Sequence, residues 1–232
     1  MAKRKVYIDL GHEGDGKGMD PGAVANGLKE ANVVLEIGKY MKDMFANYEN
    51  VEVKFSRLAN KNLSLNQRTN EANAWGADVL CSIHINAGGG KGFESFIYPG
   101  AGSATQAFQN AVHAKIMGTG VFTTDRGKKK ANFHMLRESK MTAILTENGF
   151  IDNGTDAATL KNRAKLIAIA SGHVEGVASF LNLKKKPVSK PEPKPSGKLY
   201  KVQVGAFSDR KNADNLAAEL KKIGYSTYIV HE

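Results

Sequence analysis

Two histidines and two glutamates in this sequence have the types and placement to act together on a metal ion. His12, His84 and Glu147 each stand at or just beyond the end of an apolar run typical of a strand. Glu30 opens a run with helical spacing. Two histidines and one glutamate are a known ligand set for catalytic zinc, which keeps a fourth position open for water and substrate. A further carboxylate that does not bind the metal can act as a general base, so these residues suit zinc-dependent hydrolysis.

The spacing of these four residues is weak evidence by itself. They lie 18, 54 and 63 positions apart, and no HExxH motif is present, so only the fold can bring them together. Taken singly, a histidine is more often a hydrogen-bonded surface or core residue, and Glu30 suits the positive end of a helix dipole. Glu147 is harder to explain in that way, because an unpaired carboxylate ending an apolar strand is costly. Their shared position at strand ends is the stronger argument, since ligands of open α/β sheets gather at that edge.

The elements that must position these residues alternate in the manner of an α/β fold. Hydrophobic periodicity predicts strands at 5–10, 51–55, 78–85, 92–99 and 142–147, and helices at 30–45, 65–75, 103–117 and within 157–183. Ser64 with Gln67 forms a capping-box pattern, and Ser103 with Gln106 forms a second. Residues 11–27 and the run Lys128–Lys130 are predicted as loops. We therefore expect a mostly parallel, twisted sheet flanked by helices.

One segment of the first loop imitates a nucleotide-binding motif. GHEGDGKG, residues 11–18, satisfies the first seven positions of the phosphate-binding loop, but Gly18 stands where that motif needs Ser or Thr for magnesium. The loop must also open directly into a helix, whereas Pro21 and Gly22 indicate a turn. Both departures argue against nucleotide binding.

The positive charge is concentrated in one short segment. The chain carries 33 Lys and Arg against 23 Asp and Glu, and residues 184–198 hold +5 of the resulting +10. The same segment contains four of the six prolines and no aromatic residue, which predicts a semi-extended linker. Recognition of nucleic acid needs basic residues interleaved with aromatics on a folded face, so we expect no nucleic-acid partner. Cys81 is the single cysteine and is predicted to fill the core.

Four stretches between residues 7 and 153 carry a resemblance to a known family. They are YIDLGHEGDGKGMDPGA, NGLKEANVVLEIG, the pair SR and LSLNQRTNEAN followed by ADVLCSIHINA, and LTENGFIDN. Together they make the chain similar to the zinc-dependent N-acetylmuramoyl-L-alanine amidases of bacterial cell walls and phage endolysins. The resemblance implies that His12, Glu30 and His84 ligate zinc and that Glu147 is the catalytic base. It also implies a sheet of about six strands with flanking helices, and hydrolysis of the amide between N-acetylmuramic acid and L-alanine in peptidoglycan.

The first loop departs from the family pattern, which usually runs close to GHGGxDPGA. Here the loop is longer and carries Glu13 and Asp15, so a carboxylate other than Glu30 has to be weighed as a metal ligand. We keep Glu30, because its match lies in the expected place and an extended loop can point outward.

Three further residues are predicted to bind substrate. Asp20 and Asn86 are suited to position loop or substrate amide groups, and Arg68 to hold a carboxylate in a bidentate manner. Turn capping or a helix salt bridge would explain each of them equally well. Other histidines match no ligand of the family and are predicted to be structural: His113, His134 and His173.

The C-terminal segment predicts a strand, a helix and a second strand. VQVGAF and ADNLAAELKKIGY resemble the first half of the SPOR domain, a peptidoglycan-binding module that recognises glycan stripped of its peptides. Such a module has two β-α-β halves, and this segment supplies one half module. We expect either a frayed tail or a homodimer in which two chains complete one module. The predicted organisation is a catalytic domain at 1–183, a linker at 184–198 and the half module at 199–232.

The residues alone leave other functions open. A non-catalytic peptidoglycan-binding protein is disfavoured because all four key residues are present, and a zinc peptidase cutting within the stem peptide is disfavoured only by the family resemblance. The start, MAKRKVYIDL, is too short and polar for a signal peptide or a membrane span. We therefore expect synthesis in the cytoplasm, no membrane insertion, and access to the wall after holin-mediated release or cell lysis. The sequence does not separate a phage endolysin from a host autolysin.

Overall fold

The computed structural model describes residues 3–187 and 202–230. The chain divides into two compact units, Met1–Pro187 and Val188–Glu232. Most of the predicted linker, 184–198, lies outside the described residues. Its first residues belong to the first unit, because Lys184 and Lys186 exchange backbone hydrogen bonds with Glu49 and Asn47.

A six-stranded sheet forms the centre of the first unit. Its strands are β1 (Arg4–Leu10), β4 (Val51–Phe55), β5 (Val79–Asn86), β6 (Phe93–Ile97), β7 (Asp125–Lys130) and β8 (Thr142–Phe150), in the spatial order β4-β1-β5-β8-β6-β7. All neighbours run parallel except β6 and β8, which are antiparallel. The predicted mostly parallel sheet of about six strands is confirmed.

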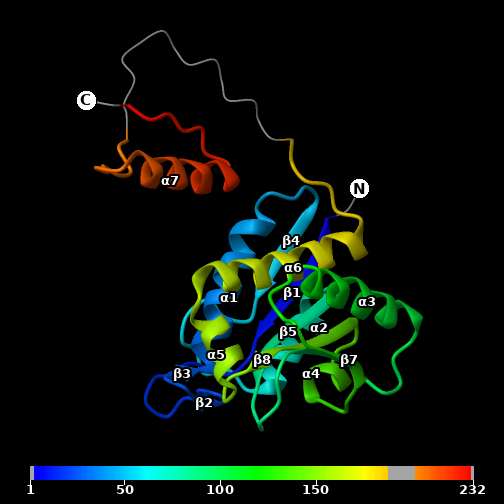
Figure 1. The fold of residues 1–232 in the computed structure, drawn as a ribbon. Coiled ribbons are helices and arrows are strands. Elements are labelled where there is room, and N and C mark those ends of the chain that lie inside the picture. The colour runs from blue at the N-terminus through cyan, green and yellow to red at the C-terminus, as the bar shows by residue number, and fades with distance from the viewer. Residues whose placement is uncertain (1–2, 188–201, 231–232) are drawn as a thin grey trace. The chain divides into compact units, whose positions relative to one another are not determined.

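Helices cover both faces of this sheet (Figure 1). α1 (Glu30–Phe45), α3 (Ser103–Met117) and α6 (Arg163–Leu181) pack on one face around the larger of two apolar cores. α2 (Leu65–Trp75) and α4 (His134–Arg137) lie on the other face over a smaller core. α5 (Gly154–Lys161) leads from β8 into α6, and a hairpin of β2 (Val24–Ala25) and β3 (Leu28–Lys29) leads into α1. The result is three layers with the sheet in the middle.

The alternation of strand side chains decides which face carries chemistry. Leu80 of β5 and Leu145 of β8 point into the smaller core. Because side chains repeat with period two, His84 and Glu147 point to that same face, further along the two strands. The register pairs His84 directly with Glu147. Two of the four predicted site residues therefore lie side by side at the carboxyl edge of the sheet.

Helix starts show where local sequence signals succeed and fail. α2 begins with the predicted capping box, in which the Gln67 amide donates to Ser64 Oγ and the Ser64 amide donates to Gln67 Oε1. The second predicted box is wrong, because Ser103 already lies inside α3 and Gly102 occupies the cap position without a side-chain bond.

β7 was predicted as a loop, and this prediction is wrong. Its sequence, DRGKKK, has no apolar residue to alternate with polar ones. The strand lies at the edge of the sheet and pairs only with β6, so it does not need a continuous apolar face. Lysines are common on such edges, where they oppose pairing with other chains.

α6 carries a buried histidine with an unusual electrostatic environment. Among the described residues, α6 is the one helix long and apolar enough to span a membrane. Half of this helix is buried in the fold, as in a core helix. His173 lies fully buried on this helix, between the Ile169 carbonyl and the Thr146 hydroxyl, at 2.9 Å from each oxygen. Burial lowers the pKa of His173 to about 4, although the bond to the Ile169 carbonyl opposes this shift.

His173 makes stability depend on pH. An unfolded histidine has a pKa near 6.5, whereas folded His173 is protonated only below about pH 4. Between these two pH values the unfolded chain binds one more proton than the folded chain, so lowering the pH destabilises the fold. We expect His173 to reduce the free energy of unfolding by about 2 kcal/mol between pH 7 and pH 5. Urea denaturation of wild type and His173→Gln at both pH values measures this. His134→Gln, at a half-buried position, is the matched control, and an unchanged pH dependence in His173→Gln would contradict the assignment.

The second unit has one helix, α7 (Arg210–Lys222), within its described residues. The segments on either side, predicted as strands, are not strands in the structure. Many of the large apolar side chains in this unit are exposed: Val202, Val204, Ile223, Tyr225 and Val230. The unit therefore covers little apolar surface of its own.

Candidate active site

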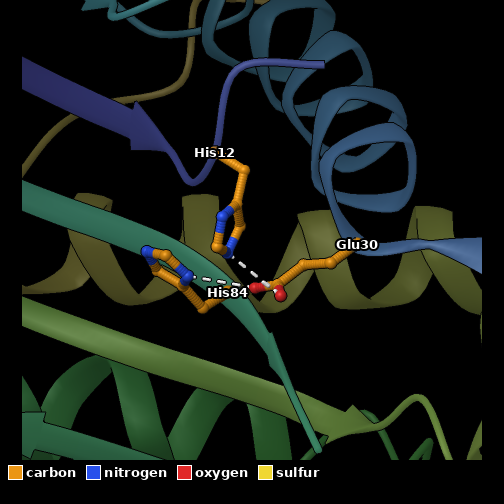
Figure 2. A group of neighbouring side chains, drawn as sticks. All are labelled: His12, Glu30 and His84. Atoms are coloured by element: carbon orange, nitrogen blue, oxygen red, sulfur yellow. Dashed lines mark hydrogen bonds and ion pairs between the residues drawn. The ribbon is translucent and has the colours of Figure 1, made fainter. Parts of the chain in front are cut away.

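His12, Glu30 and His84 come together at the carboxyl edge of the sheet (Figure 2). His12 follows β1, Glu30 is the first residue of α1, and His84 lies on β5. His12 Nε2 lies 3.0 Å from Glu30 Oε2, and His84 Nδ1 lies 3.0 Å from Glu30 Oε1. One nitrogen or oxygen from each residue lies within 4.8 Å of the other two. These three residues are called the donor group below.

The backbone folds tightly around the donor group. His12 adopts a φ of 61°, a left-handed conformation that costs a non-glycine residue on the order of 1 kcal/mol. A Cβ on Gly22 would lie 2.5 Å from the His12 ring and 2.7 Å from Glu30 Oε2. A Cβ on Gly11 would lie 2.4 Å from the His84 ring. Side chains at either glycine would displace a donor, so these glycines are needed for the close approach.

Asp20 fixes the orientation of His12. His12 Nδ1 donates to Asp20 Oδ2 at 2.7 Å, which leaves Nε2 directed toward Glu30. The second oxygen of Asp20 accepts from the Gly22 amide at 2.8 Å. A carboxylate bound to the far nitrogen of a histidine is the usual arrangement behind a metal ligand. Asp20 was predicted to bind substrate, and in the structure it positions His12.

Glu30 is held by the backbone as well as by the histidines. Its Oε2 accepts from the Ala23 amide at 3.0 Å, and its Oε1 accepts from the Ile85 amide at 2.9 Å. The carboxylate is almost completely buried. Four hydrogen-bonding contacts on one buried carboxylate leave it little freedom to rotate, so the donor atoms are fixed before any ligand arrives.

Two buried arginines hold the loop that carries His12. Arg68, predicted to bind substrate, is 2% exposed; it pairs with Asp9 at 2.8 Å and donates to the carbonyls of Leu10 and His12. Arg57 donates from Nη2 to the Gly11 carbonyl at 2.8 Å. In the structure Arg68 therefore supports the site through the backbone. No local sequence pattern indicates a role for Arg57 or Asp9, because their contacts join segments that are distant in the chain.

Glu147 lies beside the donor group but outside it. It is the register partner of His84 on β5 and of Glu94 on β6. Its Oε2 is buried and accepts no hydrogen bond from the described residues. Buried polar atoms in folded proteins nearly always have a partner, so this oxygen indicates a place for a polar ligand or water.

Glu30, His84 and Glu147 shift one another's pKa values. Burial opposes ionisation of Glu30, but the hydrogen bonds from His12 and His84 outweigh it and lower the pKa of Glu30. Burial likewise opposes protonation of His84, but the Glu30 hydrogen bond and the nearby carboxylates raise its pKa to about 9. Burial raises the pKa of Glu147 to about 7, with His84 acting in the opposite direction. The negative Glu30 carboxylate lies between one imidazole nitrogen of His12 and one of His84. This arrangement is the electrostatic setting of a cation site.

The residues of the long first loop are occupied elsewhere. Asp15 accepts from Asn32 and Asn60, and Glu13 Oε2 accepts from the Asp20 amide. Among the described residues, the group that can hold a metal ion contains Glu30 and neither of these carboxylates. The extended loop is thus fastened to the fold by its own acidic side chains.

Asn86 and the other histidines also have partners in the fold. Asn86 Nδ2 donates to Glu94 Oε1 at 2.6 Å, one strand away from Glu147. His113 lies between Ser95 Oγ at 2.8 Å and Asp125 Oδ1 at 2.9 Å. This series resembles a nucleophile triad, but Ser95 is completely buried and cannot meet a substrate. None of His113, His134 and His173 belongs to the donor group.

A donor group of two histidines and a buried glutamate, at the carboxyl edge of a three-layer α/β domain, defines a class: hydrolases of α/β architecture with the ligand set of a metal site. Comparison with known proteins gives the family. The family model described as N-acetylmuramoyl-L-alanine amidase matches residues 6–179, and the chain belongs to this family. It is a peptidoglycan amidase, and the model of the SPOR domain matches residues 196–232.

The similarity extends over nearly the whole chain. The N-acetylmuramoyl-L-alanine amidase CwlM of Bacillus licheniformis is 46% identical over 98% of this chain and 85% of its own length. The sporulation-specific N-acetylmuramoyl-L-alanine amidase of Bacillus subtilis is 45% identical over 97% of this chain and 84% of its own length. The solved catalytic domain of CwlV from Bacillus (Paenibacillus) polymyxa is 31% identical, with a TM-score of 0.72 over 78% of this chain and 99% of that structure.

Proposed function

We propose that this amidase is zinc-dependent and hydrolyses the amide between N-acetylmuramic acid and L-alanine, with His12, Glu30 and His84 as metal ligands and Glu147 as general base. The observation that carries the proposal is the donor group, whose atoms lie within 4.8 Å of one another beside an unpartnered oxygen of Glu147. Two imidazole nitrogens and a carboxylate oxygen fit zinc, which prefers such ligands with one position left open.

Each residue has a definite task in this mechanism. Zinc, when bound, lowers the pKa of a water molecule to about 7 and polarises the substrate carbonyl. Glu147 accepts a proton from the attacking water and passes it to the leaving L-alanine nitrogen. Asp20 keeps His12 in one orientation, and Arg68 keeps the His12 backbone in place. The amine then departs with the stem peptide, and the lactyl carboxylate remains on the glycan.

Two alternatives use the same fold. A non-catalytic wall-binding protein would not need the ligand set and the base together, so their presence favours an enzyme. A zinc peptidase that cuts within the stem peptide would need the same residues, and the family match favours the muramoyl amide instead.

Purified cell walls separate these alternatives. After incubation with the protein, we expect new amino groups that belong to alanine, and none when a chelator has removed the metal. New amino groups on other residues would indicate a peptidase, and no new amino groups would indicate a binding protein. Unchanged release after complete metal removal would contradict zinc dependence while leaving the amide specificity in place.

We further propose that the C-terminal unit binds peptidoglycan and pairs with a second copy. The SPOR match supports the first part. Exposed apolar residues on both sides of α7 support the second, because pairing of two units would cover them. The predicted route to the wall, by holin-mediated release or cell lysis, stays a prediction, as does the choice between an endolysin and an autolysin.

Removing residues 188–232 tests the role of the tail. If two tails hold two enzymes on one wall, attachment is bivalent, and its loss lowers retention by at least about tenfold. Cleavage of small soluble muropeptides should change by less than about twofold, because the donor group lies wholly in the first unit. Sedimentation and wall-binding assays measure the two effects. A full-length monomer at high concentration, with equal wall binding by both forms, would leave the tail without a targeting role.

A further inference from the structure

A second polar cluster continues the row of catalytic residues across the sheet. Glu94 is the register partner of Glu147 on β6, so the two side chains lie on the same face. On the far side of β6, the register to β7 shifts between Phe93 and Ser95, which places Arg126 and Gly127 beside Glu94. The row therefore runs from His84 through Glu147 and Glu94 to Arg126, at the sheet edge formed by β7.

Glu94 is the organising residue of this cluster. Its side chain is 3% exposed, and its two oxygens receive Asn86 Nδ2 at 2.6 Å, Arg126 Nε at 2.9 Å and the ammonium of Lys129. One buried negative charge thus faces two positive charges. Glu94, Arg126 and Lys129 together carry a net charge of +1.

Arg126 is held in place but not fully used. Its side chain is 33% exposed, and its guanidinium lies over the Phe150 ring, 4.7 Å from the ring centroid. Only Nε donates to a described residue; the two terminal Nη atoms donate to no group in the described part of the chain. An arginine anchored through Nε and an aromatic face presents its Nη atoms as a preorganised fork for a carboxylate.

The fold fixes the strand that carries this arginine. At its start, Asp125 accepts from His113, and near its end the Lys129 carbonyl accepts from Gln109 at 3.2 Å. Lys128 lies on the opposite face, where its ammonium donates to Asn110 of α3. Arg126 and Lys129 of β7 therefore face Glu94. Lys128 is a charged residue of the same strand that does not contact Glu94.

The distance from Glu147 fits the leaving peptide. Strands lie about 4.8 Å apart, so Arg126 on β7 is roughly 10 Å from Glu147 on β8. In the proposed function, on which this inference rests, Glu147 gives its proton to the alanine nitrogen. Two extended peptide residues reach about 7 Å from that nitrogen. The Arg126 side chain covers the rest of the distance between β7 and Glu147.

We propose that Arg126, positioned by Glu94 and supported by Lys129, forms a subsite for a carboxylate on the second residue of the leaving stem peptide. Hydrogen bonds between the charged guanidinium and a charged carboxylate are stronger than those to a neutral amide of the same shape. The subsite thus distinguishes stem peptides by the charge of their second residue, separately from the chemistry at the donor group.

A matched pair of peptides tests this subsite. L-alanyl-γ-D-glutamyl-L-lysine carries a free α-carboxylate on its second residue, and L-alanyl-D-isoglutaminyl-L-lysine carries an amide in its place; in both peptides the γ-carboxylate is taken up by the bond to lysine. Calorimetric titration of the zinc-loaded full-length protein measures the affinity of both without depending on turnover. We expect wild type to bind the carboxylate peptide about tenfold more tightly, and Arg126→Gln to bind the two equally.

Further variants keep the test decisive. Arg126→Lys retains the charge but not the fork, and should retain only part of the preference. Lys128→Gln removes one charge from the same strand and should retain all of it. Equal affinity of wild type for the two peptides, no measurable binding of either, or a preference that survives Arg126→Gln would overturn the subsite. Release of alanine amino groups from walls would in each case still support the proposed function, so the two failures are distinguishable.

Discussion

We expect His84→Ala to bind no stoichiometric zinc and to release stem peptides from walls at least about a thousand-fold more slowly than wild type. A metal that stabilises developing charge contributes several kcal/mol to the transition state, and each 1.36 kcal/mol is a factor of ten in rate. His84 provides one of the three ligands, and its Nδ1 lies 3.0 Å from Oε1 of Glu30, a second ligand.

The fold should survive this substitution. Both apolar cores are built without the donor group, so a metal is not needed to fold the domain. Elemental analysis should find one zinc per wild-type chain and none in the variant, while thermal unfolding of the ion-free proteins should differ little. His134→Ala removes a histidine outside the donor group and should keep both metal and activity. Full activity of wild type after exhaustive chelation would end the zinc assignment.

Short-range signals predicted much of the fold that positions these residues. The apolar spacing after Glu30 predicted α1 with its observed ends, and the Ser64 and Gln67 pair predicted the start of α2. Such signals depend on neighbours within one turn, so they are present in the sequence itself. β7 lacked a signal because its stability comes from hydrogen bonds to β6 and from contacts with α3, not from its own apolar pattern.

The candidate site divides along the same line. The sequence placed His12, His84 and Glu147 at strand ends, and the topology joins them because parallel strands end at one edge of the sheet. It did not reveal that Asp20 and Arg68 hydrogen-bond to His12. Their partners lie up to 59 positions away, as in the Arg68 pair with Asp9, and no local pattern encodes such contacts.

The catalytic base is tested by a change of one atom. We expect Glu147→Gln to keep its zinc and to lose activity by a factor on the order of a hundred to ten thousand, because the amide has the shape of the carboxylate but cannot accept the proton. Kinetics on soluble muropeptides and elemental analysis measure the two properties together. Activity within about threefold of wild type would show that the role is misassigned, and loss of zinc would make Glu147 a ligand instead.

The pH profile gives this variant a second readout. A general base acts only when ionised, so burial, which raises the pKa of Glu147 to about 7, predicts that activity falls as the pH drops through that region. A cation bound beside Glu147 lowers this pKa, so the acid limb of kcat/KM should lie at or below about pH 7. We expect Glu147→Gln to lack that limb.

Stability should move in the opposite direction to activity. A buried carboxyl group with a raised pKa destabilises the folded state as the pH rises above the unfolded value, because the unfolded chain ionises more easily. Glutamine in its place removes this cost, so the ion-free Glu147→Gln protein should unfold at the same temperature as wild type or higher at pH 8. A Glu147→Asp variant retains a base at a shorter reach and should recover part of the activity. A marked fall in the unfolding temperature of Glu147→Gln would point to a structural role for this carboxylate. A carboxylate that serves only catalysis should stabilise the fold no more than the amide that replaces it.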